Sequence, residues 1–125
     1  MHLTNFVESP LFTRVASASD LPITPGVYLL FNQDGHPIYV GMTDDLRRRM
    51  GEHDKETDNF WLRLYARYFV CVPTGTRELA RVCEGAVFDA FVRQYCSKPL
   101  ANHDIPPASR YNNPLLRGIA GITAN

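Results

Sequence analysis

The amino-acid sequence predicts a small α/β (α+β) domain in which a three-stranded antiparallel sheet is flanked by helices. Three observations support this prediction: two β-rich runs separated by a short turn within residues 26–41, a third strand candidate at residues 68–72, and helical periodicity over residues 76–95. The length of 125 residues suits one compact domain that can bury a sizeable core.

The first two strands form a predicted hairpin. Residues 26–31 (GVYLLF) and 37–41 (PIYVG) are rich in aliphatic and aromatic side chains. The segment Asn32-Gln33-Asp34-Gly35 between them is typical of a turn, because glycine tolerates a positive φ and Asn and Asp side chains bond their own backbone. Antiparallel pairing would bring Tyr28 close to Tyr39, although the sequence leaves the register open.

A helix is predicted directly after the hairpin. Thr43 is the expected N-cap, and Asp44 and Asp45 would place negative charge in the first turn, where the helix dipole favours it. Leu46 and Met50 are four residues apart and would mark the apolar side of this helix.

Residues 76–95 give the clearest helical pattern. The apolar residues recur at three- and four-residue steps: Leu79, Val82, Cys83, Ala86, Val87, Ala90 and Phe91. Glu84 falls at the border of this stripe. A carboxylate in that place is either the partner of an arginine, with Arg49, Arg77 and Arg81 as candidates, or a metal ligand.

Four polar or aromatic residues of the hairpin and first helix form a candidate site. Arg49 and His53 are four residues apart and share a helix face, and Tyr28 and Tyr39 lie on the hairpin. For any one residue alone, a structural role explains it best: the tyrosines fill the sheet surface and Arg49 pairs with Asp45. Their combination and order point to chemistry.

These residues resemble the motifs of the GIY-YIG nuclease family. The first motif reads GVY at residues 26–28, the second reads YVG at residues 39–41, and the helical pattern Leu46-x-x-Arg49-x-x-x-His53 follows. Valine for isoleucine is a common family variant. The lead-in from Leu21 to Gly26 also resembles the N-terminal nuclease domain of the bacterial excision-repair nuclease subunit, and small stand-alone GIY-YIG proteins are similar. The resemblance covers residues 21–102.

The resemblance implies a divalent-metal-dependent endonuclease that hydrolyses DNA phosphodiester bonds, on structure-specific or repair-related substrates. Glu84 would hold one Mg²⁺ or Mn²⁺ ion, since these hard cations prefer oxygen ligands. Arg49 would contact the scissile phosphate, which suits its fixed fork of donors. Cleavage would leave a 5′-phosphate and a 3′-hydroxyl.

The remaining catalytic roles also follow from the resemblance. Tyr28 would act as the general base on the attacking water. Because a tyrosine has a reference pKa of about 10, it needs help, which His53 would give by accepting the phenolic proton or orienting the ring. Tyr39 would assist from the second strand. Asn102, in the Pro-x-x-Asn sequence that follows the long helix, would help to hold the site.

Composition limits how the chain would bind nucleic acid. The formal net charge is zero, whereas binding to duplex DNA depends on neutralising phosphates with basic residues. The positive charge is local: Arg47, Arg48 and Arg49 are consecutive and are the predicted nucleic-acid-binding residues. Affinity should therefore be modest and salt-sensitive, or a protein partner should supply the recognition.

The other composition signals are those of an ordinary globular protein. Three widely spaced cysteines support neither a zinc site nor a disulfide framework, and buried free thiols are expected. No apolar run is long enough to span a membrane, so we expect no membrane partner and a cytoplasmic location. Trp61 is expected in the core.

The chain is divided by prediction into an N-terminal extension (1–20), a GIY-YIG nuclease-like domain (21–102) and a C-terminal arm (103–125). The arm should be partly ordered through Tyr111, Leu115 and Leu116. The alternative to an enzyme is a partner-dependent or catalytically silent nucleic-acid- or protein-binding module on the same fold. The sequence leaves open DNA against RNA, the substrate structure and the oligomeric state.

Overall fold

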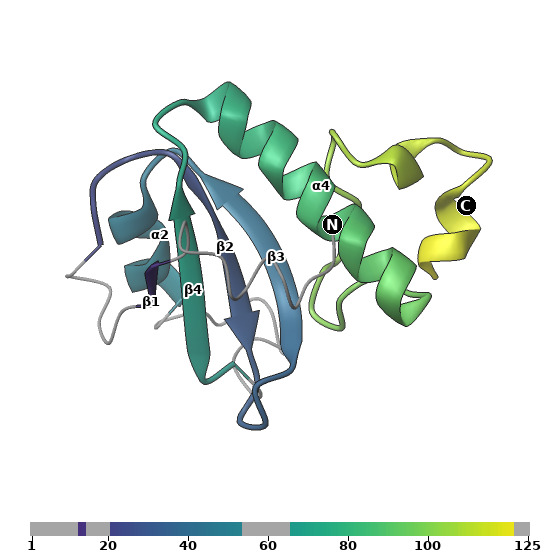
Figure 1. Cartoon of the computed structure of the whole chain (residues 1–125), viewed down its shortest axis with the longest axis horizontal. Helices are drawn as coiled ribbons and strands as arrows, with labels where there is room; N and C mark the ends of the chain where they lie inside the picture. Colours follow the sequence, from purple (N-terminus) through teal and green to yellow (C-terminus); the bar gives the residue numbers. More distant parts are fainter. Residues whose placement is uncertain (1–12, 15–20, 54–65, 122–125) are drawn as a thin grey trace.

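The computed structural model describes residues 13–14, 21–53 and 66–121, with side chains for residues 21–52 and 66–121 (Figure 1). The aromatic segment that contains Trp61 lies outside the described residues. The elements in chain order are β1 (Thr13–Arg14), β2 (Gly26–Phe31), β3 (Pro37–Thr43), α2 (Leu46–His53), β4 (Tyr68–Pro73), α4 (Arg77–Tyr95), and the 3₁₀ helices η2 (Arg110–Asn112) and η3 (Arg117–Ala120).

The sheet has the strand order β1-β4-β2-β3, and each neighbouring pair is antiparallel. The predicted three-stranded antiparallel sheet is confirmed as β4-β2-β3. The two-residue strand β1 extends it, with Thr13 opposite Cys71 and Arg14 opposite Val70. A strand of two residues has too short a pattern to be recognised from sequence, which is why it was not predicted.

The hairpin forms as predicted, and the structure settles its register. Tyr28 pairs with Gly41, and Leu30 pairs with Tyr39. Tyr28 and Tyr39 are therefore diagonal neighbours on one face of the sheet. The turn holds Gly35 at a φ of 79°, a conformation that favours glycine, while the side chain of Asn32 accepts the backbone N–H groups of Asp34 and His36.

The helices α2 and α4 lie on opposite faces of the sheet (Figure 1). On the α4 face the core contains Val27, Leu29, Phe31, Val40, Val70, Val72, Ala80, Val87 and Phe91. On the α2 face it contains Leu21, Tyr28, Leu30, Leu46, Met50, Cys71 and Ala101. The alternation of β2 residues between these sets follows from the two-residue period of a strand.

The start of α2 corrects one prediction. Thr43 is the last residue of β3, and the cap of α2 is Asp45, whose carboxylate accepts the backbone N–H of Arg48 at 3.0 Å. The hydroxyl of Thr43 instead accepts the N–H of Asp45 at 3.1 Å. Asp44 and Asp45 precede the helix rather than filling its first turn. Leu46 and Met50 face the core as predicted.

The predicted helix at 76–95 is confirmed as α4, with Thr76 as its N-cap. The predicted apolar stripe is only partly right, because the side chains of Leu79 and Val82 are 57% and 62% exposed. The buried surface of α4 extends beyond the predicted stripe in the C-terminal half of the helix. There a third cluster forms with the C-terminal arm: Phe88, Val92, Ile105, Tyr111 and Ala120, with Leu116 packed against it.

The C-terminal arm (residues 103–121) returns along α4 (Figure 1). Tyr111 is buried, in agreement with the prediction, whereas Leu115 is 89% exposed, so the prediction that it helps to order the arm is wrong. Of the free cysteines, Cys71 is buried as expected, Cys83 is half-buried and Cys96 is exposed. None of the helices in the described ranges combines the length and the apolar content that a membrane span needs.

Candidate active site

The two motif tyrosines stack over a glycine. The rings of Tyr28 and Tyr39 have centroids 5.9 Å apart and an interplanar angle of 19°. A Cβ atom added to Gly41 would lie 2.5 Å from the phenol carbon of Tyr28 and 2.8 Å from the ring of Tyr39. These distances are far inside van der Waals contact, so the last residue of the second motif must be glycine for both rings to pack.

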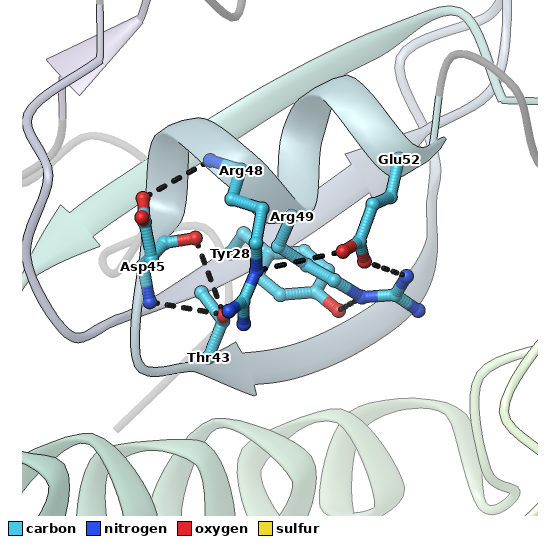
Figure 2. Close-up of polar contacts among 6 residues, drawn as sticks. All are labelled: Tyr28, Thr43, Asp45, Arg48, Arg49 and Glu52. Atoms are coloured by element: carbon cyan, nitrogen blue, oxygen red, sulfur yellow. Dashed lines mark hydrogen bonds and ion pairs between the residues drawn. The ribbon is translucent and has the colours of Figure 1, made fainter.

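Arg49 joins this pair from α2. Its Nε donates a hydrogen bond to the hydroxyl of Tyr28 at 3.3 Å, and its Nη1 lies 3.0 Å from a carboxylate oxygen of Glu52 (Figure 2). The carboxylate of Asp45, the partner that a purely structural role would give to Arg49, caps the helix at Arg48 instead. The guanidinium of Arg49 is thus held against a buried phenol.

Burial determines the protonation state of Tyr28. Removal from water raises the pKa of Tyr28 above its ordinary value, and the neighbouring Tyr39 adds to the effect. The charge and hydrogen bond of Arg49 act in the opposite direction without cancelling it. Tyr28 is therefore a neutral phenol in the free protein, and it can serve as a base only if its own proton leaves during the reaction.

Glu84 lies on the opposite face of the sheet, on α4, with only 8% of its surface exposed. Desolvation raises the pKa of this carboxyl to about 7, although a hydrogen bond to the backbone of Met42 opposes the rise. Two of the arginines proposed as its partner are engaged elsewhere, Arg49 with Glu52 and Arg77 with Asp44 at 3.5 Å. In the part of the chain that is described, no cation pairs with Glu84.

A pocket of about 290 Å³ brings Glu84 to the edge of the sheet. It is lined by Tyr39, Val40, Glu84, Asn102 and residues 103–107. The side chain of Asn102 accepts the backbone N–H of Val40 and donates to its carbonyl, both at 3.0 Å. Asn102 therefore satisfies the outer edge of β3 and fixes one side of the pocket.

The donor set of the pocket fits a weakly held divalent cation. Over the described ranges, no group of three or more His, Cys, Asp or Glu side chains is placed to hold a metal ion. Glu84 by itself offers a desolvated carboxylate, which gains from a nearby cation. Mg²⁺ and Mn²⁺ accept one protein carboxylate together with water and phosphate oxygens. Such a site suits metal binding that depends on the substrate.

The structure brings the predicted residues together in two connected groups. Tyr28, Tyr39 and Arg49 contact one another on the α2 side, whereas Tyr39, Glu84 and Asn102 line one pocket. Tyr39 belongs to both groups and so links the two sides around the β3 edge.

Arg47 and Arg48 are not among the residues that line the pocket. Arg47 is tied to the lead-in segment, because its Nε donates to the carbonyl of Leu21 at 2.8 Å. Arg48 is exposed and its Nε lies 3.4 Å from Glu52. His53 ends α2, but its side chain lies outside the described residues.

Sequence reasoning missed the arm as a wall of the pocket. Residues 103–107 line it, and Gly85 allows the arm to approach, because a Cβ atom there would lie 2.6 Å from the backbone of Ala108. A glycine inside a helical pattern was the available signal, since it costs helix stability and implies close packing.

Comparisons with known proteins agree with the motifs. Residues 24–73 match the family model described as the GIY-YIG catalytic domain. The UvrABC system protein C of Methanothermobacter thermautotrophicus is 34% identical over 56 residues, which cover 45% of this chain and 10% of the relative. The protein of the same name from Deinococcus radiodurans is 51% identical over 35 residues, 28% of this chain and 6% of the relative.

A third relative, from Mycobacterium tuberculosis, is named provisionally as a bifunctional exonuclease/endonuclease and is 40% identical over 57 residues, 46% of this chain and 9% of that protein. The matched segments thus amount to a tenth or less of the length of these curated relatives. No solved structure matches significantly. The segment that matches the GIY-YIG catalytic domain, residues 24–73, contains both tyrosine motifs and Arg49.

Proposed function

We propose that this chain is a divalent-metal-dependent endonuclease that hydrolyses DNA phosphodiester bonds, on structure-specific or repair-related substrates. The observation that carries the proposal is the meeting of the Tyr28–Tyr39–Arg49 group and the Glu84 pocket at the β3 edge. The names of the relatives, which include an endonuclease and the C protein of the UvrABC system, support the same function and a link to repair.

Arg49 would bind the scissile phosphate. Phosphodiester hydrolysis develops negative charge on the phosphoryl oxygens, and a fixed guanidinium stabilises that charge. Nε of Arg49 is already oriented by Tyr28 and Nη1 by Glu52, so little conformational freedom is lost when the phosphate arrives.

Glu84 would hold the divalent cation. A bound Mg²⁺ or Mn²⁺ supplies charge stabilisation at the phosphate and the leaving oxygen. Because the carboxyl of Glu84 has a pKa of about 7, it is only partly ionised in the free protein near neutral pH, and a cation would favour its ionised form. Cation binding to the free protein should therefore be weak and should strengthen with rising pH.

Tyr28 would take a proton from the attacking water as its own phenolic proton leaves. The phenol is neutral at rest, so two proton movements are coupled in this step. His53 is the proposed acceptor of the phenolic proton, and Tyr39 would position the ring of Tyr28 through their stacking. Asn102 would keep the β3 edge and the pocket in register.

The alternative function is a nucleic-acid- or protein-binding module that needs a partner or lacks turnover. Its support is the charge distribution: the formal net charge is zero, Arg47 is committed to Leu21, and Arg48 is paired with Glu52. A partner that supplies DNA recognition would reconcile this surface with the enzyme, since phosphate neutralisation dominates affinity for duplex DNA.

The deciding experiment is cleavage of a panel of labelled nucleic acids at low salt: duplex, single-stranded, flap and nicked DNA, and a matched RNA. Each would be incubated with Mg²⁺, with Mn²⁺ or with EDTA, using wild-type protein and the Glu84→Ala variant. We expect metal-dependent cutting that leaves a 5′-phosphate and is lost in Glu84→Ala. A folded protein that binds DNA but cuts none of the panel would favour the binding module.

A further inference from the structure

The C-terminal arm contributes a side of the pocket that faces Glu84 and Tyr39. Residues 103–107 line the pocket together with these two residues, although they follow the matched family segment by thirty positions along the chain. His103 and Asp104 are both exposed, so a ligand in the pocket can reach their side chains. The wall that the arm adds to the pocket therefore includes two exposed polar side chains.

The packing against α4 fixes this wall in place. The hydroxyl of Ser109 donates to Asp89 of α4 at 2.6 Å, and the backbone N–H of Arg110 donates to the same carboxylate at 3.2 Å. Ile105 is buried against the C-terminal half of α4. Gly85 admits the arm at close range beside Glu84. The arm is thus anchored at several points, and the position of its first residues follows from those anchors.

Among the side chains that the arm adds to the pocket, His103 is the best suited to meet a phosphate. The side-chain amide of Asn102 is already hydrogen-bonded to the backbone of Val40, and the negative charge of Asp104 would repel a phosphate. The imidazole offers a ring N–H donor in either protonation state. Ring nitrogen donors to phosphate oxygens are among the contacts that position a nucleic-acid strand without reading its sequence.

We infer that His103 donates a hydrogen bond to a backbone phosphate of the substrate strand, next to the phosphate at which that same strand is cut. The arm thereby forms part of the substrate-binding surface. This inference rests on the proposed nuclease function. The contact positions the strand and takes no part in bond cleavage, so His103 contributes to substrate affinity and hardly at all to the chemical step.

The test measures two quantities in the full chain. Steady-state cleavage of the best DNA substrate with Mg²⁺ gives KM and kcat, and the anisotropy of a fluorescein-labelled copy of that DNA in EDTA gives Kd without turnover. For His103→Ala we expect KM and Kd to rise about tenfold, the usual loss for one hydrogen bond to a charged group. kcat should stay the same. His103→Gln, which keeps an N–H donor, should recover part of the affinity.

The matched control is His36→Ala. His36 is also exposed, but its ring packs on Tyr95, with centroids 4.9 Å apart, and it is not among the pocket residues. This variant should keep the wild-type KM and Kd. Circular dichroism of all three variants establishes that the fold is intact.

The outcomes separate this inference from the proposed function. If the wild-type protein cuts DNA and His103→Ala has the same KM and Kd, the inference is wrong and the nuclease function stands. If the wild-type protein binds DNA without cutting it, the Kd comparison still decides on His103. If it neither binds nor cuts nucleic acid, both the function and the inference are overturned. A fall in kcat alone would also contradict the inference.

Discussion

The polar side chains on the two faces of the sheet differ in how fully they are paired. On the α2 face, the hydroxyl of Tyr28 is bonded to Arg49, and Arg49 is paired with Glu52. On the α4 face, Glu84 is almost fully buried, is hydrogen-bonded to the backbone of Met42 and pairs with no cation among the described residues, and burial raises its pKa to about 7. Tyr28 and Arg49 thus have polar partners within the protein, whereas the carboxylate of Glu84 has no cationic partner among the described residues.

Because of this difference, the two faces would contribute to catalysis in different ways. Groups that already bond one another, such as Tyr28 and Arg49, are held in position at little further cost. A buried carboxylate without a cation reduces the stability of the free protein and gains most when a cation binds. In the proposed nuclease, the α2 face would therefore orient the substrate phosphate, whereas the α4 face would gain stability by binding a cation.

Gly41→Ala should damage the oriented group most strongly. The added methyl group would lie 2.5 Å from the phenol of Tyr28, and the rings can move only by disturbing the sheet. We expect a loss of about 3 kcal/mol in the free energy of unfolding, measured by urea denaturation. Gly51→Ala is the matched control, because nothing lies within 4 Å of its Cβ position on α2. A Gly41→Ala protein as stable as wild type would contradict the stacking described for Tyr28 and Tyr39.

Glu84→Gln should stabilise the metal-free protein at neutral and higher pH. The pKa of Glu84 is raised from 4.5 to about 7, so the folded state holds this proton more tightly than the unfolded state. Stability is then highest below the unfolded pKa and falls as pH rises through 7, by on the order of 2–3 kcal/mol. The variant removes that fall. Urea unfolding at a series of pH values in EDTA measures it.

The control for this pH dependence is Glu78→Gln, which changes an exposed glutamate in the first turn of the same helix. It should leave the wild-type slope between pH 4.5 and 7 in place. If Glu84→Gln and wild type lose stability in parallel over this range, Glu84 is not the desolvated group described above.

Asn102→Ala should have an intermediate effect. It leaves the N–H and carbonyl of Val40 without their partner at a buried edge, where an unsatisfied group costs about 1–3 kcal/mol. We expect a loss of about 2 kcal/mol in urea denaturation. Asn112→Ala, which removes one exposed contact of 3.4 Å to Pro107, should change stability far less. Equal losses in the two variants would argue against a structural role for Asn102 at the pocket.

Leu79→Ala should have the smallest effect, because Leu79 is 57% exposed on α4. Its substitution should change the free energy of unfolding by no more than about 0.5 kcal/mol, whereas Val87→Ala, at a fully buried position of the same helix, should cost about 2 kcal/mol. A large loss of stability for Leu79→Ala would mean that Leu79 belongs to the buried face of α4, as the sequence predicted.

Local chemistry made much of the fold predictable. The hairpin has a strong turn signal in Asn32 to Gly35, and α4 begins at the hydroxyl cap of Thr76, so both elements were predicted within a few residues. The cap of α2 was misplaced because Thr43 and Asp45 are both good caps, and only the length of β3 decides between them.

Long-range packing explains what the sequence did not predict. The arm packs beside the C-terminal half of α4, where Phe88 and Val92 are buried with it, and it lines the pocket that contains Glu84, whereas Leu79 in the first turn of the helix is exposed. Tyr111 and Leu116 predicted that the arm is partly ordered, but no local pattern in residues 103–121 indicates that it packs on α4. The roles of Tyr28, Tyr39, Arg49, His53 and Glu84, and the domain boundaries at residues 20 and 102, remain predictions from the family motifs.

The most direct test of the central claim, that both faces act as one nuclease site, is single-turnover DNA cleavage with Mg²⁺. It compares wild type, Arg49→Ala, Glu84→Gln and Arg77→Ala, where Arg77 is the control because it is an exposed arginine whose Nε lies 3.5 Å from Asp44. We predict that Arg49→Ala and Glu84→Gln each slow cleavage by about 100-fold or more, and that Arg77→Ala has little effect. Cleavage that survives unchanged in either Arg49→Ala or Glu84→Gln would contradict the claim.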